Sequence, residues 1–310
     1  MIQAESTETY LKPTEKTVLK GYQQCRDFVR ENFDEFKWAF SNLSGHQKYG
    51  VWAILTFSGR CWQLLNLDQG SKEAAEIQNE WRDENRDWFN GKYRSAKLVA
   101  LLDTFHKFRL DRKYLVNMLE GVEYWLSRRE FKTLDELQEF VRLIGGPVIQ
   151  AIGQIVEYDH GDVESNERRA EQIGQAIAVS QMLSRTASNV KRGRVFFPTE
   201  LLTEYDCRVS DLCLGRGGPG FDRMVQVIAD QARSDLLEGA HLLGDLSFDG
   251  QRVMKSILSL TLRVLDVIRE SPESVLERRV QFSLMEQFRF QLKHILGMEG
   301  TKELEKFVHH

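Results

Sequence analysis

The strongest pattern in the sequence lies in residues 170–198, which read AEQIGQAIAVSQMLSRTASNVKRGRVFFP. Over the first two-thirds of this stretch, small and apolar residues recur at three- and four-residue steps, as they do on one face of an α-helix. These residues are Ile173, Ile177, Ser180, Ser184 and Ala187. The pattern therefore predicts a helix.

A second face of the same helix is polar and carries no carboxylate. Gln181, Arg185 and Asn189 are four residues apart, so they share this face. The stretch ends in a basic turn that contains glycine, KRGR at residues 191–194, and then in the apolar residues VFFP at 195–198. A polar helix face followed by a basic turn is a candidate binding surface.

Another helix is predicted from about His46 to Leu67. Its centre, VWAILTF at residues 51–57, is apolar on nearly all sides, which indicates a buried helix. Gln63 and Asn66 share one face near its end. Asp68 points away from that face, because each residue turns a helix by about 100°.

Both stretches resemble squalene and phytoene synthases. There, the first reads roughly N-I-L-R-D-V-x-x-D and then R-G-R-x-Y-L-P, and the second R-x-x-A-V-W-A-I-Y-A-F-C-R-x-x-D-D-x-x-D. In alignments without gaps, the family's aspartates fall on Arg185, Asn189, Trp62, Gln63 and Asn66. The second arginine of the longer motif falls on Gly59, and Arg60, one residue away, is a candidate replacement for its charge. We therefore expect a diverged member that lacks both aspartate-rich motifs.

Weaker segments of the same kind follow in order between about Phe36 and Phe288. The resemblance implies an all-α fold, a single-domain helical bundle around a central apolar cavity, as in isoprenoid synthases. It also implies a prenyltransferase of terpenoid biosynthesis that acts on prenyl diphosphates. In the family, two aspartate-rich motifs face each other across the cavity and hold magnesium ions, which neutralise the diphosphate leaving group.

The organisation expected along the chain is simple. We expect a flexible N-terminal arm at residues 1–15, the helical domain at 16–298 and a C-terminal tail at 299–310, with a further short pattern at 36–40. Beyond the two stretches above, helices are expected at 17–33, 73–89, 95–108, 113–126, 134–156, 221–243, 253–268 and 275–296. The pattern at 134–156 is interrupted by Gly145-Gly146-Pro147, and residues 215–220 form a glycine-rich linker.

Composition excludes several classes of protein. A formal net charge of −4 over 310 residues argues against nucleic acid as a partner. Four cysteines without metal-type spacing, and the absence of a signal-peptide pattern, lead us to expect reduced thiols in a cytoplasmic protein. The sequence has no apolar run of the roughly 20 residues that span a bilayer, although peripheral membrane contact is compatible with it.

The family's metal site is not expected here. Magnesium prefers hard oxygen ligands, usually carboxylates. Gln63, Asn66 and Asn189 are neutral and Arg185 is cationic, so these side chains do not offset the charge of several magnesium ions. No cofactor is expected, and magnesium is doubtful.

The candidate substrate-binding residues are amides and cations. Arginine side chains match phosphate oxygens, so the cations could hold a diphosphate directly; they could equally form a solvated basic face. The amides either bind a ligand or fill the vacated metal site. The set comprises Arg60, Gln63, Asn66, Gln181, Arg185, Asn189, Lys191, Arg192 and Arg194. Trp62 and Trp125 are expected to fill core volume rather than shape a pocket.

An apolar cavity is expected to persist beside these residues. Its expected lining comprises Ile54, Phe57, Leu64, Val148, Ile152, Ile177 and Leu183. Two functions then remain open. One is a diverged prenyltransferase-type enzyme that binds a prenyl diphosphate or a similar lipid without the two-motif magnesium site. The other is an inactive assembly or scaffold factor with a protein partner, similar to the respiratory complex I assembly factor of the same family. Head-to-head synthesis by the usual mechanism ranks third.

Overall fold

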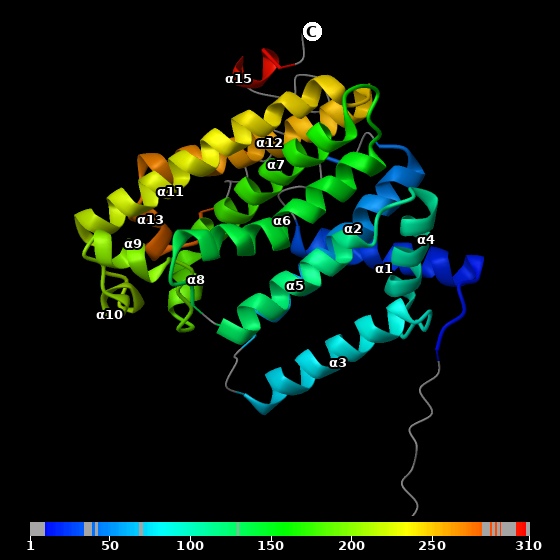
Figure 1. Cartoon of the computed structure of the whole chain (residues 1–310), viewed down its shortest axis with the longest axis horizontal. Helices are drawn as coiled ribbons and strands as arrows, with labels where there is room; N and C mark the ends of the chain where they lie inside the picture. Colours follow the sequence, from blue (N-terminus) through cyan, green and yellow to red (C-terminus); the bar gives the residue numbers. More distant parts are fainter. Residues whose placement is uncertain are drawn as a thin grey trace, which may run out of the picture.

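The computed structural model describes residues 10–33, 39–40, 43–67, 71–128, 130–280, 286, 289, 292 and 302–307. Its helices, shown in Figure 1, are α1 Glu15–Asn32, α2 Gly45–Leu65, α3 Lys72–Phe89, α4 Ala96–Lys107, α5 Lys113–Arg128, α6 Leu134–Ile155, α7 Val163–Ser184, α8 Thr186–Val190, α9 Thr199–Glu204, α10 Val209–Cys213, α11 Gly218–Gly239, the 3₁₀ helix η1 Ala240–Asp245, α12 Phe248–Glu270, α13 Ser274–Glu277 and α15 Lys302–Glu305. In this described part, β structure is limited to two isolated bridges, Leu11 with Tyr93 and Tyr158 with Leu246. The predicted all-α fold is confirmed.

Most of the long helices begin at a short polar residue that caps them. The side chain of each accepts a hydrogen bond from a backbone N–H of the first turn, which stabilises a helix by about 1 kcal/mol. The capping residues are Thr14, Ser44, Ser71, Ser95, Thr133, Asp162 and Ser247. At Ser44 the cap is reciprocal, because the side chain of Gln47 accepts from the Ser44 N–H in turn. Local sequence therefore sets where these helices start.

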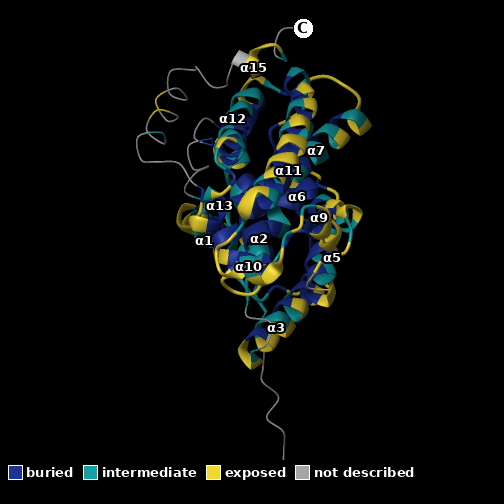
Figure 2. Cartoon of the chain, turned by 90° about the vertical axis from the view of Figure 1, so that its left-hand side faces the viewer, coloured by how far each residue is buried: buried dark blue, intermediate teal, exposed yellow. Residues whose placement is uncertain are grey.

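Helices α2 and α6 form the centre of the bundle. Helix α2 packs against α1, α4, α5 and α6, and α6 packs against α5 and α7. Helix α11 packs against α7, and α12 packs against both α11 and α7 (Figure 1). From Val51 onward most residues of α2 are buried, as its apolar sequence predicted, whereas the outer helices show exposed faces (Figure 2).

Helices α6 and α7 cross with their backbones nearly in contact. A Cβ atom built on Gly145 would lie 2.2 Å from the carbonyl oxygen of Gly174, and one built on Gly174 would lie 2.3 Å from that of Gly145. The expected interruption of the helix at Gly145-Gly146-Pro147 was wrong, because α6 runs through all three residues. These glycines permit close packing, and packing against neighbours stabilises the helix through a proline.

The helix expected at 275–296 was right in part. Residues 275–277 lie in α13, and the described residues 286, 289 and 292 are helical, but residues 278–280 are not. Helix α13 ends at Glu277, and Arg278 is extended, with φ −153° and ψ 166°. The backbone N–H of Val280 instead donates a 3.0 Å hydrogen bond to the carbonyl oxygen of Ser184 at the end of α7. The chain after α13 therefore runs beside the end of α7. Most of the remainder of that predicted helix, and most of the pattern at 36–40, lie outside the described residues.

Both ends of the chain are packed where they are described. The Leu11 N–H donates to the Tyr93 carbonyl at 2.7 Å, within the segment expected to be a flexible arm. Tyr10, next to Leu11, donates a hydrogen bond to Asp87, which also accepts one from Arg94. In the expected tail, Leu304 is fully buried. The boundaries of the helical domain at 16 and 298 stay a prediction.

Candidate functional site

A cavity of about 400 Å³ lies between α2, α6 and α7. Its walls are apolar over most of their length. They carry side chains from all three helices, two from the segment between α1 and α2, and one from α12. The apolar lining comprises Phe33, Phe40, Leu55, Trp62, Ile144, Val148, Ile149, Ile152, Ile177, Ala178 and Ile257. The two helices singled out from the sequence, α2 and α7, thus line one cavity.

Polar side chains gather where α1, α2 and α7 end, and we call this part of the lining the mouth. It comprises Glu31, Asn32, Gln63, Asn66, Gln181, Arg185 and Arg279. The Gln63 amide donates to Asn32 Oδ1 at 3.4 Å, and Arg185 Nε donates to Gln181 Oε1 at 3.3 Å. Of the nine substrate-binding candidates, the structure brings four to the mouth: Gln63, Asn66, Gln181 and Arg185.

Arg279, Glu31 and Asn32 were missed from the sequence. Arg279 reaches the mouth because Val280 is hydrogen-bonded to Ser184, the last residue of α7. No local pattern in the sequence singles out any of the three. The place of Arg279 depends on this hydrogen bond between distant residues, and that of Glu31 and Asn32 depends on how α1 packs against α2.

Arg60 does not replace the family's arginine in the cavity. It is absent from the lining, and its charge acts on Glu84 of α3. Burial raises the pKa of Glu84, and the positive charge of Arg60 opposes that rise. At Gly59 a Cβ atom would lie 2.6 Å from the ring of Phe28 and 2.9 Å from that of Phe33. Aromatic rings therefore occupy the space beside Gly59, and one step along the helix turns Arg60 outward.

Arg194 is a buried clamp rather than a mouth residue. Its Nη2 atom donates to the carbonyl oxygens of Asn66 at 2.5 Å and Leu67 at 2.8 Å, and its Nη1 atom donates to Asn66 Oδ1 at 3.2 Å. Because the last carbonyls of a helix lack partners within the helix, Arg194 supplies them with donors and places a positive charge at the C-terminal end of α2. The turn at residues 191–194 thus fixes the end of α2.

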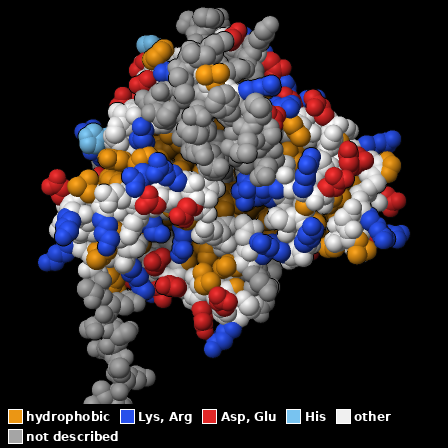
Figure 3. Space-filling view, turned by 180° about the vertical axis from the view of Figure 1, so that it is seen from behind, with side chains coloured by type: hydrophobic (Ala, Val, Ile, Leu, Met, Phe, Trp, Pro, Cys, Tyr) orange, Lys and Arg blue, Asp and Glu red, His pale blue; other side chains and the backbone are white. Residues whose placement is uncertain are grey.

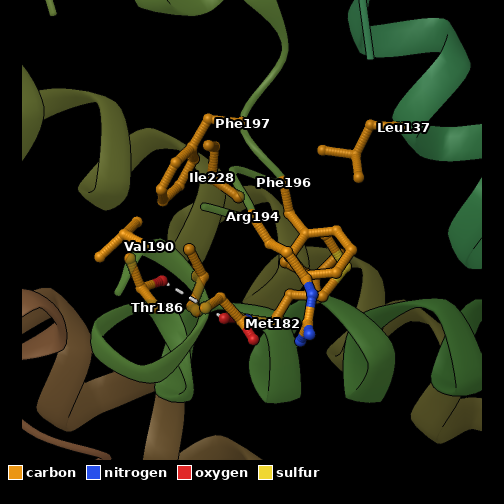
Figure 4. A pocket seen from close by; sticks show the side chains of 11 residues that line it. Leu137, Met182, Thr186, Val190, Arg194, Phe196, Phe197 and Ile228 are labelled. Carbon is orange, nitrogen blue, oxygen red and sulfur yellow. Dashed lines mark hydrogen bonds between the residues drawn. The ribbon is translucent and has the colours of Figure 1, made fainter. Parts of the chain in front are cut away.

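Asn189 also lies outside the cavity. It lines a separate small pocket of about 20 Å³, into which Arg194 and Phe196 also point (Figure 4). Lys191 and Arg192 are exposed at the tip of the turn. On the face seen in Figure 3, the coloured Lys and Arg side chains are interspersed with those of Asp and Glu.

The expected apolar lining was right in part. Val148, Ile152 and Ile177 line the cavity, whereas Leu183 lines the small pocket. The remaining three, Ile54, Phe57 and Leu64, are buried in the core. Trp62 lines the cavity, contrary to expectation, because it lies on the same face of α2 as Ser58 and Gly59.

Trp125 fills core volume, as expected. It is almost fully buried, and its ring stacks on that of Phe196 with centroids 4.4 Å apart. Phe131 and Phe140 complete the aromatic cluster around it. This cluster supports the chain directly after the basic turn, and so helps to hold Arg194 against α2.

The donors at the mouth are amides and guanidinium groups. Among the lining residues that the structure describes, Glu31 alone bears a carboxylate. Throughout the described ranges, no three His, Cys, Asp or Glu side chains are grouped so that they could hold a metal ion. Such a mouth offers hydrogen-bond donors and two positive charges, from Arg185 and Arg279, above an apolar cavity. Its chemistry suits an amphipathic ligand with an anionic or polar head.

No described helix has the length and apolar character to cross a membrane.

Comparison with known proteins places this geometry in a family. The profile of the squalene/phytoene synthase family matches residues 29–286. The chain is 23% identical to a 15-cis-phytoene synthase of Synechocystis over 288 residues, which cover 90% of this chain and 85% of that protein. Its fold is similar to the crystal structure of a dehydrosqualene synthase in complex with ligand, with a TM-score of 0.79 and 17% identity over 93% of this chain and 99% of that one. It is also similar to squalene synthase HpnC from Alicyclobacillus acidocaldarius, with a TM-score of 0.71 and 18% identity over 83% and 96% of the two chains. The chain therefore belongs to the squalene/phytoene synthase family.

Proposed function

We propose that this protein binds an isoprenoid in the cavity between α2, α6 and α7, as a diverged prenyltransferase-type protein without the family's two-motif magnesium site. The observation that carries the proposal is an apolar cavity that ends in a polar mouth, because this shape matches a greasy chain with a polar head. The relatives are phytoene synthases and the similar structures include a squalene synthase, which supports an isoprenoid as the ligand class.

The donor set of the mouth does not fit magnesium. Mg²⁺ takes oxygen ligands in an octahedral arrangement and is usually held through carboxylates. Here the positions on which the family's aspartates fall carry Trp62, Gln63, Asn66, Arg185 and Asn189, and Asn189 lies outside the cavity. Arg185 brings a positive charge to the place where the family has a carboxylate. We therefore propose no step through magnesium.

Burial of the chain supplies the binding energy in this proposal. Each CH₂ group removed from water contributes about 0.8 kcal/mol. Ten such groups give about 8 kcal/mol, from which about 4 kcal/mol or more is lost because the ligand gives up its freedom of motion. A measurable affinity therefore needs no metal.

The alternative is an inactive assembly or scaffold factor. The same replacement of carboxylates favours it, because diphosphate ionisation by the family's route needs charge neutralisation that this mouth lacks. The two functions differ in one property: an assembly factor has no need of a ligand in the cavity.

Calorimetric titration with farnesol and with farnesyl diphosphate tests the proposal. We expect binding by the wild-type protein, and loss of binding in Ile177→Trp, whose larger ring would occupy the cavity. Val227→Trp is the matched control, because Val227 lies on the exposed face of α11. If the wild-type protein binds neither compound, the cavity is a relic and the assembly-factor function takes the place of ours.

A further inference from the structure

We propose that Arg185 and Arg279 together hold the diphosphate head directly, so that recognition of the head needs no divalent cation. This inference rests on the proposed function and specifies how the same cavity recognises its ligand. It adds Arg279 to the binding residues, and it predicts that magnesium does not raise the affinity, in contrast to a metal-dependent site.

The backbone brings the two arginines together. Val280, next to Arg279, donates its N–H to the carbonyl oxygen of Ser184, next to Arg185, at 3.0 Å. Arg279 and Arg185 each lie one residue from this hydrogen bond, and both side chains line the same cavity. They come from positions 94 residues apart, since 279 minus 185 is 94, so only the fold makes them neighbours.

Among the residues that the structure describes, the negative charges that would repel an anion at this mouth are compensated or few. The carboxyl-terminal end of a helix carries a partial negative charge, and α2 ends here, but Arg194 caps its last carbonyls. The carbonyl of Arg185, at the end of α7, accepts N–H groups from Ser188 and Asn189 in α8. Against the two arginines, the described lining offers the single negative charge of Glu31.

The chemistry of guanidinium suits this role. Its N–H donors form paired, charge-assisted hydrogen bonds with phosphate oxygens, and it stays charged at any physiological pH. The amides of Gln63 and Gln181 at the same mouth can donate further hydrogen bonds. Magnesium in solution binds the same phosphate oxygens, so it competes with the arginines instead of assisting them. Added magnesium should therefore leave the affinity unchanged or lower it.

The experiment titrates the full chain with farnesyl diphosphate and with farnesol, in EDTA and again in magnesium chloride. The variant is Arg279→Gln, and its matched control is Arg278→Gln, the exposed neighbour that makes no contribution to the lining. We expect Arg279→Gln to weaken farnesyl diphosphate binding about tenfold or more, the loss that corresponds to one charge-assisted hydrogen bond. Farnesol binding by this variant, and both affinities of Arg278→Gln, should stay at wild-type values.

Arg185→Gln should show the same selective loss, and Arg279→Lys should recover part of it, since lysine keeps the charge but not the planar fork. If each variant unfolds at the same temperature as the wild type, its loss of binding does not arise from a loss of folding. Binding of the diphosphate only when magnesium is present overturns the inference. Equal affinity for farnesol and farnesyl diphosphate, unchanged by either substitution, also overturns it but leaves isoprenoid binding standing. Absence of any binding removes the proposed function and this inference together.

Discussion

Arg194 offers the sharpest test of how the site is built, because sequence and structure assign it different roles. The sequence predicts a substrate-binding arginine, whereas the structure shows a side chain only 7% exposed that donates three hydrogen bonds to the end of α2. We consider Arg194→Gln, which removes the charge and shortens the side chain beyond reach of Leu67. The two roles predict different outcomes.

The expected cost follows from these contacts. Three hydrogen bonds at about 1 kcal/mol each give about 3 kcal/mol, and at the value of about 1.5 kcal/mol for a bond to a charged group they give about 5 kcal/mol. Part of this cost arises because the carbonyls of Asn66 and Leu67 lose their donor. The free energy of unfolding of a natural domain is about 5–15 kcal/mol, so this cost is a large fraction of the stability.

Urea unfolding measures this difference. The midpoint of Arg194→Gln should fall well below that of the wild type with an unchanged slope, because the unfolded surface is the same. Arg192→Gln is the matched control, since Arg192 lies in the same turn but is exposed. If both variants unfold at the wild-type midpoint, and Arg194→Gln alone loses farnesyl diphosphate binding, then our assignment of Arg194 as a clamp is wrong.

Three further predictions concern the scaffold. Gly174→Ala should lower the urea midpoint, because the new Cβ would lie 2.3 Å from the Gly145 carbonyl oxygen, and overpacking by about 1–3 kcal/mol outweighs a gain of about 1 kcal/mol in helix propensity. Iodoacetamide should label Cys213, which is exposed, well before Cys61, since burial raises the pKa of the Cys61 thiol to about 12; equal labelling rates in the folded protein, read by mass spectrometry, would contradict this. Burial alone would raise the pKa of Asp87, but hydrogen bonds from its arginine and tyrosine partners hold that pKa below its usual value. The wild type should therefore be more stable than Asp87→Asn at neutral pH, and this difference in unfolding free energy should shrink as the pH falls below about 4, whereas a pH-independent difference would exclude the ion pair as its cause.

The sequence predicted the elements whose signals are local. The apolar residues 51–57 indicated a buried helix, and α2 is buried along this stretch. Four-residue spacing placed Gln181 and Arg185 on one face, and both line the cavity. In these cases the period of the helix alone determines which side chains lie together. The fold class was predictable for the same reason.

The parts that could not be predicted depend on geometry beyond one helix. Arg60 and Gly59 differ by a single step, but that step turns Arg60 away from the cavity. Arg194 follows a turn, and only the path of that turn decides whether its side chain meets a ligand or the end of α2. Arg279 reaches the mouth through a hydrogen bond between residues almost a hundred positions apart. No pattern within a window of sequence carries such information.

The same separation explains how the fold of the family can carry different residues at the mouth. The bundle is held by contacts such as the crossing of Gly145 and Gly174, which make no use of the mouth. Gln63 and Arg185 lie at helix ends and face the cavity, so a substitution at either position removes no core packing. Fold and mouth chemistry can therefore change independently, and similarity of fold cannot establish what the mouth does. In our proposal the charges there select the head group of the ligand, and the magnesium dependence of binding tests this selection directly.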